Sequence, residues 1–326
     1  MSEMTIDTVG NTEVAESTET VEVAESTEVT ESAESAESAE SARRGLELPG
    51  SVNLRDVGGY RAADGRRVRW RTLLRCGAMH ALTDTARARF AQLGLRSVVD
   101  LREAGERAQE PDALGQLPAR SVWVPIYTVP PADAAPTDAA SATAQANTAQ
   151  AAAATPGAAA AAGANAAMDV LRGAGAAVSL QAIYDFAVDN RGDRLTAAVL
   201  ALAEPGALPG IVHCSAGKDR TGMVVAMVLD LCGVPDETIA ADFALTARYL
   251  REEAIAAVRQ LAGAGAGAGP GDLPTDVMAC PPQLILDTLA RIRARHGDVR
   301  GYLLAHGATP QALDRLVEAL LTDDNR

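Results

Sequence analysis

Ten consecutive residues, 213–222, carry the clearest chemical pattern in this chain of 326 residues. They read His-Cys-Ser-Ala-Gly-Lys-Asp-Arg-Thr-Gly, so five residues separate Cys214 from Arg220. The small residues between them allow successive backbone N–H groups to turn inward and form an anion-binding nest at the start of a helix. These N–H dipoles and the guanidinium of Arg220 would favour thiolate over thiol at Cys214. The spacing therefore predicts a loop that binds phosphate beside a nucleophilic sulfur.

The side chains of this run have distinct expected roles in phosphoryl transfer. Cys214 would attack phosphorus, and Arg220 would bind two equatorial phosphate oxygens with its planar fork. Thr221 would donate its hydroxyl to the sulfur, and His213 would fix the loop through backbone hydrogen bonds rather than act as a base. The expected substrate-binding residues are Ser215, Ala216, Gly217, Lys218, Asp219, Arg220 and Thr221.

The elements on either side must place this loop at the end of a strand. The apolar stretch 208–212 predicts the strand, and the apolar run 221–232, stopped by Gly233 and Pro235, predicts a buried helix. Other predicted strands are 68–74, 96–101 and 121–127. Other predicted helices are 83–93, 180–202, 236–261, 282–295 and one that begins at Pro310 with Thr309 as its cap. The pattern predicts one α/β domain with a central, mostly parallel sheet flanked by helices and a mostly helical second half.

The ten-residue run resembles the signature of the Cys-dependent protein tyrosine phosphatase superfamily: His-Cys, five residues, Arg, then Ser or Thr. Its Gly-Lys-Asp-Arg-Thr-Gly form is similar to a bacterial branch, of the mycobacterial type, whose members act on phosphotyrosine, phosphoserine or phosphothreonine, and phosphoinositides. Matching stretches elsewhere are 53–59, 74–78, 99–102, Glu106, 111–112 and 242–246. The resemblance covers about 52–321 with one insertion, and it departs from the branch at Leu54 and Cys76, where an aromatic residue and Ser are expected. It implies a Cys-dependent phosphatase fold.

The leaving oxygen needs a proton from a carboxylic acid, which can later activate water as a base. Asp100 ends a buried-strand pattern, where an α/β sheet presents side chains to the crevice at its carboxyl edge. The resemblance also implies Asp100 as this acid. Asp219 is the alternative, although it could instead orient Arg220 or cap the following helix. We favour Asp100 of the two, and turn or cap chemistry for Asp56.

Lys218 widens the range of expected substrates. Its ammonium group would lie on the rim of the loop and could attract additional phosphate groups. Lipid phosphatases with Lys at the same place resemble this sequence, which implies a phosphoinositide substrate. Pairing of Lys218 with Asp219 or a neighbouring carboxylate is an equal alternative.

Composition separates a tail from the folded body. Residues 1–42 contain 12 acidic and no basic side chains in a repetitive pattern, which predicts a disordered tail that does not bind nucleic acid. The remaining 31 acidic and 29 basic residues nearly balance, so 43–326 is expected to form a single, nearly neutral phosphatase domain. An Ala-rich insertion at about 129–177 is expected to be a mobile linker or an active-site lid. The segment 249–261 is the other lid candidate.

Cysteine and histidine usage predicts a reduced protein without metal or cofactor. Cys76, Cys214, Cys232 and Cys280 show no paired spacing, and the four histidines show no metal-ligand spacing with them. Cys76 could be a redox partner of Cys214, but a buried spectator is favoured. Without a signal peptide or an apolar membrane span, we expect a cytoplasmic location, with export by another route left open. No oligomeric state is predicted.

Three classes of function follow from these residues. The leading hypothesis is a phosphomonoester hydrolase that works through a phosphocysteine intermediate, with phosphotyrosine protein or phosphoinositide as substrate. A phosphate-binding pseudoenzyme would usually lack Cys214 or Arg220, and both are present. A thiol redox enzyme would need a resolving cysteine near the loop, but Cys232 is 18 residues away in a predicted buried helix.

Overall fold

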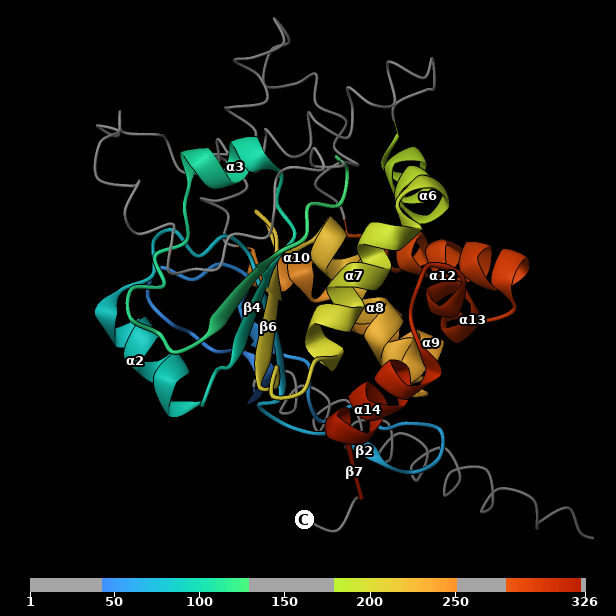
Figure 1. Cartoon of the computed structure of the whole chain (residues 1–326), viewed down its shortest axis with the longest axis horizontal. Coiled ribbons are helices and arrows are strands. Elements are labelled where there is room, and N and C mark those ends of the chain that lie inside the picture. Colours follow the sequence, from blue (N-terminus) through green and yellow to red (C-terminus); the bar gives the residue numbers. More distant parts are fainter. Residues whose placement is uncertain (1–42, 129–178, 251–279, 324–326) are drawn as a thin grey trace, which may run out of the picture. The chain divides into compact units, whose positions relative to one another are not determined.

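The computed structural model describes residues 43–128, 179–250 and 280–323 (Figure 1). The predicted acidic tail 1–42, the Ala-rich insertion at 129–177 and most of the second lid candidate lie outside the described residues. The chain divides into two units, 1–43 and 44–326, and the elements below belong to the second.

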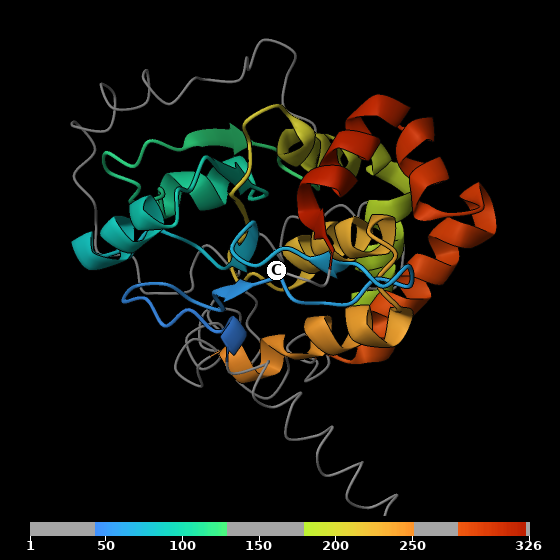
Figure 2. The same ribbon diagram turned by 90° about the horizontal axis from the view of Figure 1, so that it is seen from below.

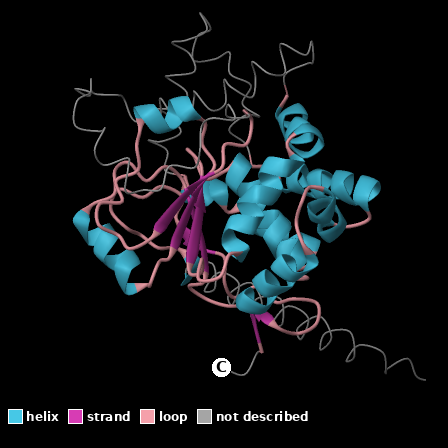
Figure 3. Cartoon of the chain, in the orientation of Figure 1, coloured by secondary structure: helices cyan, strands magenta, loops and turns pink. Residues whose placement is uncertain are grey.

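A five-stranded, mostly parallel sheet forms the centre of the described structure (Figure 3). Its strands, in spatial order, are β1 (Arg55–Asp56), β3 (Leu73–Cys76), β6 (Gly210–His213), β4 (Ser97–Asp100) and β5 (Arg120–Trp123). Strand β1 is antiparallel to β3, and the other neighbours are parallel. Every residue of β3, β4 and β6 is buried, as expected when helices cover both faces of a parallel sheet. The predicted α/β class with a mostly parallel sheet is confirmed.

The two faces of the sheet bury separate apolar clusters because side chains alternate along each strand. Val212 and Cys214 belong to the cluster that includes residues of α7 (Gly192–Ala203) and α8 (Asp219–Leu231). Ile211 and Cys76 belong to the cluster that includes residues of α2 (Asp84–Gln92). Figure 1 shows α2 on one side of the strands, with α7 and α8 on the other.

The predicted helical second half is confirmed, and α8 lies at its centre (Figure 2). Helix α8 contacts α7, α9 (Asp236–Ala244), α12 (Pro282–His296) and α13 (Val299–Ala305). All residues from 220 to 229 are buried, which explains why this stretch is apolar almost without interruption. The other elements are α3 (Ala104–Gln109), α6 (Leu180–Asn190), α10 (Thr246–Tyr249), α14 (Pro310–Leu320), and β2 (Arg67–Val68) paired with β7 (Leu321–Thr322).

Cap chemistry predicted the limits of several helices correctly. The Thr83 hydroxyl accepts from Ala86 N at the start of α2, and the Thr309 hydroxyl accepts from Ala312 N at the start of α14. Gly94, beyond the end of α2, has a φ of +71°, a conformation that glycine adopts without strain. None of the described helices is both long enough and apolar enough to cross a bilayer.

Four predicted elements are wrong in extent. The predicted strand 121–127 is β5, which ends at Trp123. The predicted strand 68–74 is split into β2 and β3 by a turn in which Arg71 has a φ of +59°. The predicted helix 180–202 is α6 followed by α7, because Arg191 between them has a non-helical φ of −132°. Gly192, which opens α7, packs so closely on His306 that a Cβ would lie 2.4 Å from the ring. The predicted helix from 236 divides into α9 and α10 at Leu245, and its part beyond 250 lies outside the described residues.

Candidate active site

The run 213–222 joins β6 to α8 at the carboxyl edge of the sheet, so the strand, loop and buried helix follow one another as predicted. His213 ends β6, Cys214 to Lys218 form the loop, and Asp219 opens the first turn of α8. Cys214 is 2% exposed. The partial positive charge at the start of α8 therefore lies close to a buried sulfur.

The carbonyl groups of the loop are held by donors in the surrounding scaffold. The donors are Ala78 N to Ser215 O (2.8 Å), Asn53 Nδ2 to Ala216 O (3.0 Å) and Gly217 O (2.9 Å), and Arg75 Nη2 to Gly217 O (2.9 Å). In a trans peptide the C=O and the following N–H point in opposite directions. The N–H groups that follow these carbonyls are therefore turned away from the scaffold, an arrangement suited to binding an anion.

Close backbone packing between the loop and the end of β3 requires glycine at two positions, one on each side of the contact. Gly217 has a φ of +66°, and a Cβ there would lie 2.4 Å from the carbonyl carbon and oxygen of Cys76. A Cβ on Gly77 would lie 2.8 Å from Ser215 O. The loop consequently rests directly on the backbone that follows β3.

Arg220 is oriented by Glu106, a buried side chain of α3. Arg220 Nη1 donates to Glu106 Oε2 (2.6 Å), and Nη2 donates to Oε1 (2.8 Å). The Ser215 hydroxyl also donates to Glu106 Oε1, and Leu101 O accepts from Arg220 Nη1 at 3.4 Å. The guanidinium carbon lies 5.3 Å from the ring centre of Tyr127. At the level of sequence, Glu106 is only part of the resemblance and has no assigned role, because nothing in its local sequence indicates which cation its carboxylate meets.

A buried network of charged side chains, centred on Asp242, connects the loop to α9. Asp242 of α9 lies 2.6 Å from Arg75 Nη1 and 3.3 Å from Arg55 Nε, and it accepts from the Tyr60 hydroxyl at 3.0 Å. Burial alone would raise the pKa of Asp242, but the two guanidinium charges outweigh it and lower this pKa to about 2. Since Arg75 also holds Gly217 O, the network connects α9 to the loop.

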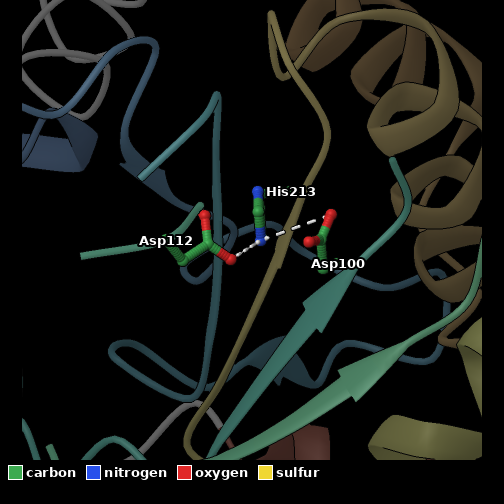
Figure 4. Close-up of side chains that lie close together, drawn as sticks. All are labelled: Asp100, Asp112 and His213. Carbon is green, nitrogen blue, oxygen red and sulfur yellow. Dashed lines mark ion pairs between the residues drawn. The ribbon is translucent and has the colours of Figure 1, made fainter. Parts of the chain in front are cut away.

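Asp100, the favoured general acid, lies at the end of β4 in a buried ion-pair cluster. Its Oδ2 lies 2.9 Å from Arg102 Nη2 and 2.9 Å from Arg107 Nε, and its Oδ1 accepts from Arg102 Nε at 2.9 Å. His213 Nε2 lies 3.7 Å from Asp100 Oδ1 (Figure 4). Both oxygens of Asp100 are thus held by guanidinium groups, and its side chain has no exposed surface.

His213 is held between Asp112 and the loop. Its Nε2 lies 3.2 Å from Asp112 Oδ2 (Figure 4). Its Nδ1 lies 3.4 Å from Cys214 O. Burial would lower the pKa of His213, but the charges of Asp112 and Asp100 raise it. Burial would conversely raise the pKa of Asp112, but His213 and Arg102 lower it to about 2. These contacts suit the predicted scaffold role of His213.

Asp100, Asp112 and His213 form a group whose ligand atoms lie within 4.8 Å of one another, as a metal site would require. Arg102 and Arg107 already pair with the two carboxylates, which balances both negative charges. A divalent cation would have to displace these guanidinium groups from a buried position. The donor set therefore fits an ion-pair cluster better than a metal centre.

Asp219, the alternative acid, has a different environment. Its side chain is 29% exposed, and Asp219 directly precedes Arg220 in the sequence. Its Oδ1 accepts from the Tyr184 hydroxyl at 2.8 Å and lies 3.4 Å from Lys218 Nζ. Of the two candidate acids, Asp219 is the one with solvent access beside the loop.

Two other predicted side chains lie as follows. The buried Thr221 hydroxyl has no hydrogen-bond partner among the described residues, so the predicted bond from this hydroxyl to the sulfur of Cys214 is not formed here. Cys76 and Cys214 belong to the apolar clusters on opposite faces of the sheet. Burial raises the pKa of the Cys76 thiol far above its usual range. This environment favours the buried-spectator interpretation of Cys76.

Comparison with known proteins gives one family match that covers most of the chain. The model of the tyrosine phosphatase family matches residues 46–322. A tyrosine-protein phosphatase of Nostoc commune is 31% identical over 36% of this chain and 40% of its own length. The triple specificity protein phosphatase PtpB of Mycobacterium tuberculosis is 28% identical over 60% of this chain and 67% of its own length. A crystal structure of P. aeruginosa TpbA in complex with pTyr covers 68% of this chain and 89% of TpbA, with 15% identity and a TM-score of 0.27.

Proposed function

The chain belongs to the tyrosine phosphatase family, and from this premise we propose that it hydrolyses phosphotyrosine monoesters through a phosphocysteine intermediate. The observation that carries the proposal is the pairing of Arg220 with Glu106 across the loop that holds Cys214. This pairing orients the guanidinium of Arg220 next to the place that a phosphoryl group would occupy, before substrate binds.

In the first half of the reaction the Cys214 thiolate attacks phosphorus. A P–S bond forms as the bond from phosphorus to the leaving oxygen breaks. Arg220 and the loop N–H groups bind the equatorial oxygens, and a carboxylic acid donates its proton to the leaving oxygen. In the second half, the resulting carboxylate takes a proton from water as the water oxygen attacks phosphorus. The P–S bond then breaks, which releases phosphate and restores the thiolate.

We assign the acid to Asp219, the alternative that the sequence left open. An acid must be protonated before it donates and must reach a substrate above the loop. Asp100 is fully buried, and both of its oxygens bind guanidinium groups, so neither oxygen is free to reach a substrate. Asp219 is partly exposed and adjacent to Arg220. The surroundings of Asp100 support a structural role, in which it holds Arg102 near the end of β6.

Vanadate-sensitive release of phosphate from an aryl phosphate tests the reaction. Cys214→Ser should abolish turnover, because the hydroxyl is not ionised at neutral pH. Cys232→Ser, which alters another buried thiol at the far end of α8, should retain it. Turnover that survives Cys214→Ser would refute the proposal, and an inactive wild-type protein would favour phosphate binding without catalysis.

Paired substrates test the choice of acid. Asp219→Asn should lower kcat by about 10²–10⁴-fold for phenyl phosphate and much less for p-nitrophenyl phosphate, whose leaving group needs little protonation. Asp100→Asn should lower stability and slow both substrates alike. The reverse pattern would return the acid role to Asp100.

The substrate beyond phosphotyrosine stays a prediction. The name of the mycobacterial relative describes a protein phosphatase of triple specificity. Lys218 is almost fully buried and lies 3.4 Å from Asp219 Oδ1, which supports the pairing interpretation of this residue. A selective loss of phosphoinositide turnover in Lys218→Ala would instead support lipid recognition. The cytoplasmic location also remains a prediction.

A further inference from the structure

Asp219 has two unequal oxygens. Its Oδ1 accepts from the Tyr184 hydroxyl at 2.8 Å and faces Lys218 Nζ at 3.4 Å. Its Oδ2 accepts no hydrogen bond from any other residue in the parts of the chain that the structure describes. When the carboxyl group is protonated, Oδ1 keeps these donors and the proton resides on Oδ2. Because Tyr184 and Lys218 hold Oδ1, Oδ2 is the oxygen of Asp219 that is available to a substrate.

Tyr184 is well placed to hold that oxygen because its own position is fixed. It lies in α6, is fully buried, and packs edge-on against Phe243 of α9 with 6.3 Å between ring centres. Burial and the nearby charge of Asp219 raise the pKa of Tyr184 well above its usual value, so the hydroxyl remains a donor. Helix α6 is itself anchored, since the Tyr302 hydroxyl of α13 donates to Val188 O at 2.9 Å.

We propose that Tyr184 is a positioning residue for proton transfer, which fixes Oδ1 of Asp219 so that the proton on Oδ2 faces the leaving oxygen. The inference rests on the proposed function, in which Asp219 is the acid. In the forward step the Oδ2–H bond breaks as the proton moves to the leaving oxygen. In the second step Oδ2 takes a proton from the attacking water. Tyr184 keeps its own proton throughout.

This role makes a specific kinetic prediction for Tyr184→Phe. The variant removes the hydroxyl but preserves the packing against Phe243. We expect kcat for phenyl phosphate to fall by about five- to tenfold, the effect of one hydrogen bond, with little change for p-nitrophenyl phosphate. A purely structural role would slow both substrates by the same factor.

Tyr302→Phe is the matched control, because it removes another buried tyrosine hydroxyl that contacts α6. It should lower the urea midpoint without changing the ratio of the two kcat values. Tyr184→Phe should change the ratio. An unchanged ratio in Tyr184→Phe, or an equal change in Tyr302→Phe, would overturn the inference.

A double-mutant cycle separates this inference from the assignment on which it rests. If Tyr184 acts through Asp219, Tyr184→Phe should have no further effect on the ratio in the Asp219→Asn background. An equal effect in both backgrounds would refute the positioning role. If Asp219→Asn alone leaves the ratio unchanged, the acid assignment itself fails, and the inference about Tyr184 fails with it. If Asp219→Asn changes the ratio of the two kcat values as expected but Tyr184→Phe leaves it unchanged, only the inference about Tyr184 is overturned.

Discussion

Replacing Asp242 with Asn removes a buried negative charge that two guanidinium groups share. Arg75 and Arg55 lie 2.6 and 3.3 Å from its carboxylate, and their charges hold its pKa at about 2 rather than 3.8. A difference of nearly two pKa units corresponds to about 2 kcal/mol. This free energy is the expected pH-dependent contribution of the carboxylate to stability.

The direction of the pH dependence follows from whether the folded or the unfolded state binds the Asp242 proton more tightly. The folded pKa is the lower one, so the contribution is fully present above 3.8 and is lost as the pH falls through about 2. Asn cannot ionise and resembles the protonated carboxyl group. At pH 7, Asp242→Asn should therefore be less stable by about 2 kcal/mol, or about 5–10 °C in Tm. Near pH 2 the variant and the wild type should have the same stability.

Urea denaturation between pH 7 and pH 2 measures this convergence. The pKa of Asp112 is also lowered to about 2, so both proteins lose its contribution on acidification, and the difference between them isolates Asp242. Asp287→Asn, which removes an exposed carboxylate of α12, should remain within about 0.5 kcal/mol of wild type. A stability gap for Asp242→Asn that is independent of pH would refute the reasoning, as would a variant as stable as wild type at pH 7.

Three other changes test the surroundings of the loop. Glu106→Gln removes one of the two carboxylate oxygens that orient the guanidinium of the loop, and kcat/KM for an aryl phosphate should fall by about 10–100-fold. Gly217→Ala should lower the free energy of unfolding, measured with urea, by about 3 kcal/mol. The added Cβ would clash with the backbone of Cys76, and a positive φ is strained for alanine. Gly206→Ala, at a similar φ in open space, should cost about 1 kcal/mol, and equal costs would contradict the clash. Cys76→Ser should leave the recovery of activity by thiols after peroxide treatment unchanged, because Cys76 packs in a different apolar cluster from Cys214 and burial raises the pKa of its thiol far above the usual range; impaired recovery would show that the two cysteines form a disulfide.

The strand, loop and helix around Cys214 could be predicted because their residues are contiguous, so that spacing alone brings Cys214 and Arg220 into one turn. The partner of Arg220 could not be predicted in this way. Glu106 lies 114 positions earlier in the chain, and only the sheet order brings α3 over the loop. A buried guanidinium needs a counter-charge, but the sequence offers many carboxylates.

The interpretation of Asp100 shows a second limit. The strand pattern predicted its position at the carboxyl edge of the sheet, and β4 does end there beside His213. The same pattern could not show that Arg102 and Arg107 turn back to bind this carboxylate. Side-chain direction at a strand end depends on the loop that follows, and hydrophobic periodicity carries no information about that loop.

The contacts of Arg220 also determine how a phosphoryl group can approach it. A guanidinium has five N–H donors. Glu106 accepts one from each terminal nitrogen, and Leu101 O accepts the second from Nη1. Within the described structure, one proton on Nη2 and the proton on Nε remain, and these two lie along a single edge of the guanidinium plane. If Arg220 binds the phosphoryl group as proposed, two phosphoryl oxygens must meet that edge, so the protein would set the direction of approach before any substrate arrives.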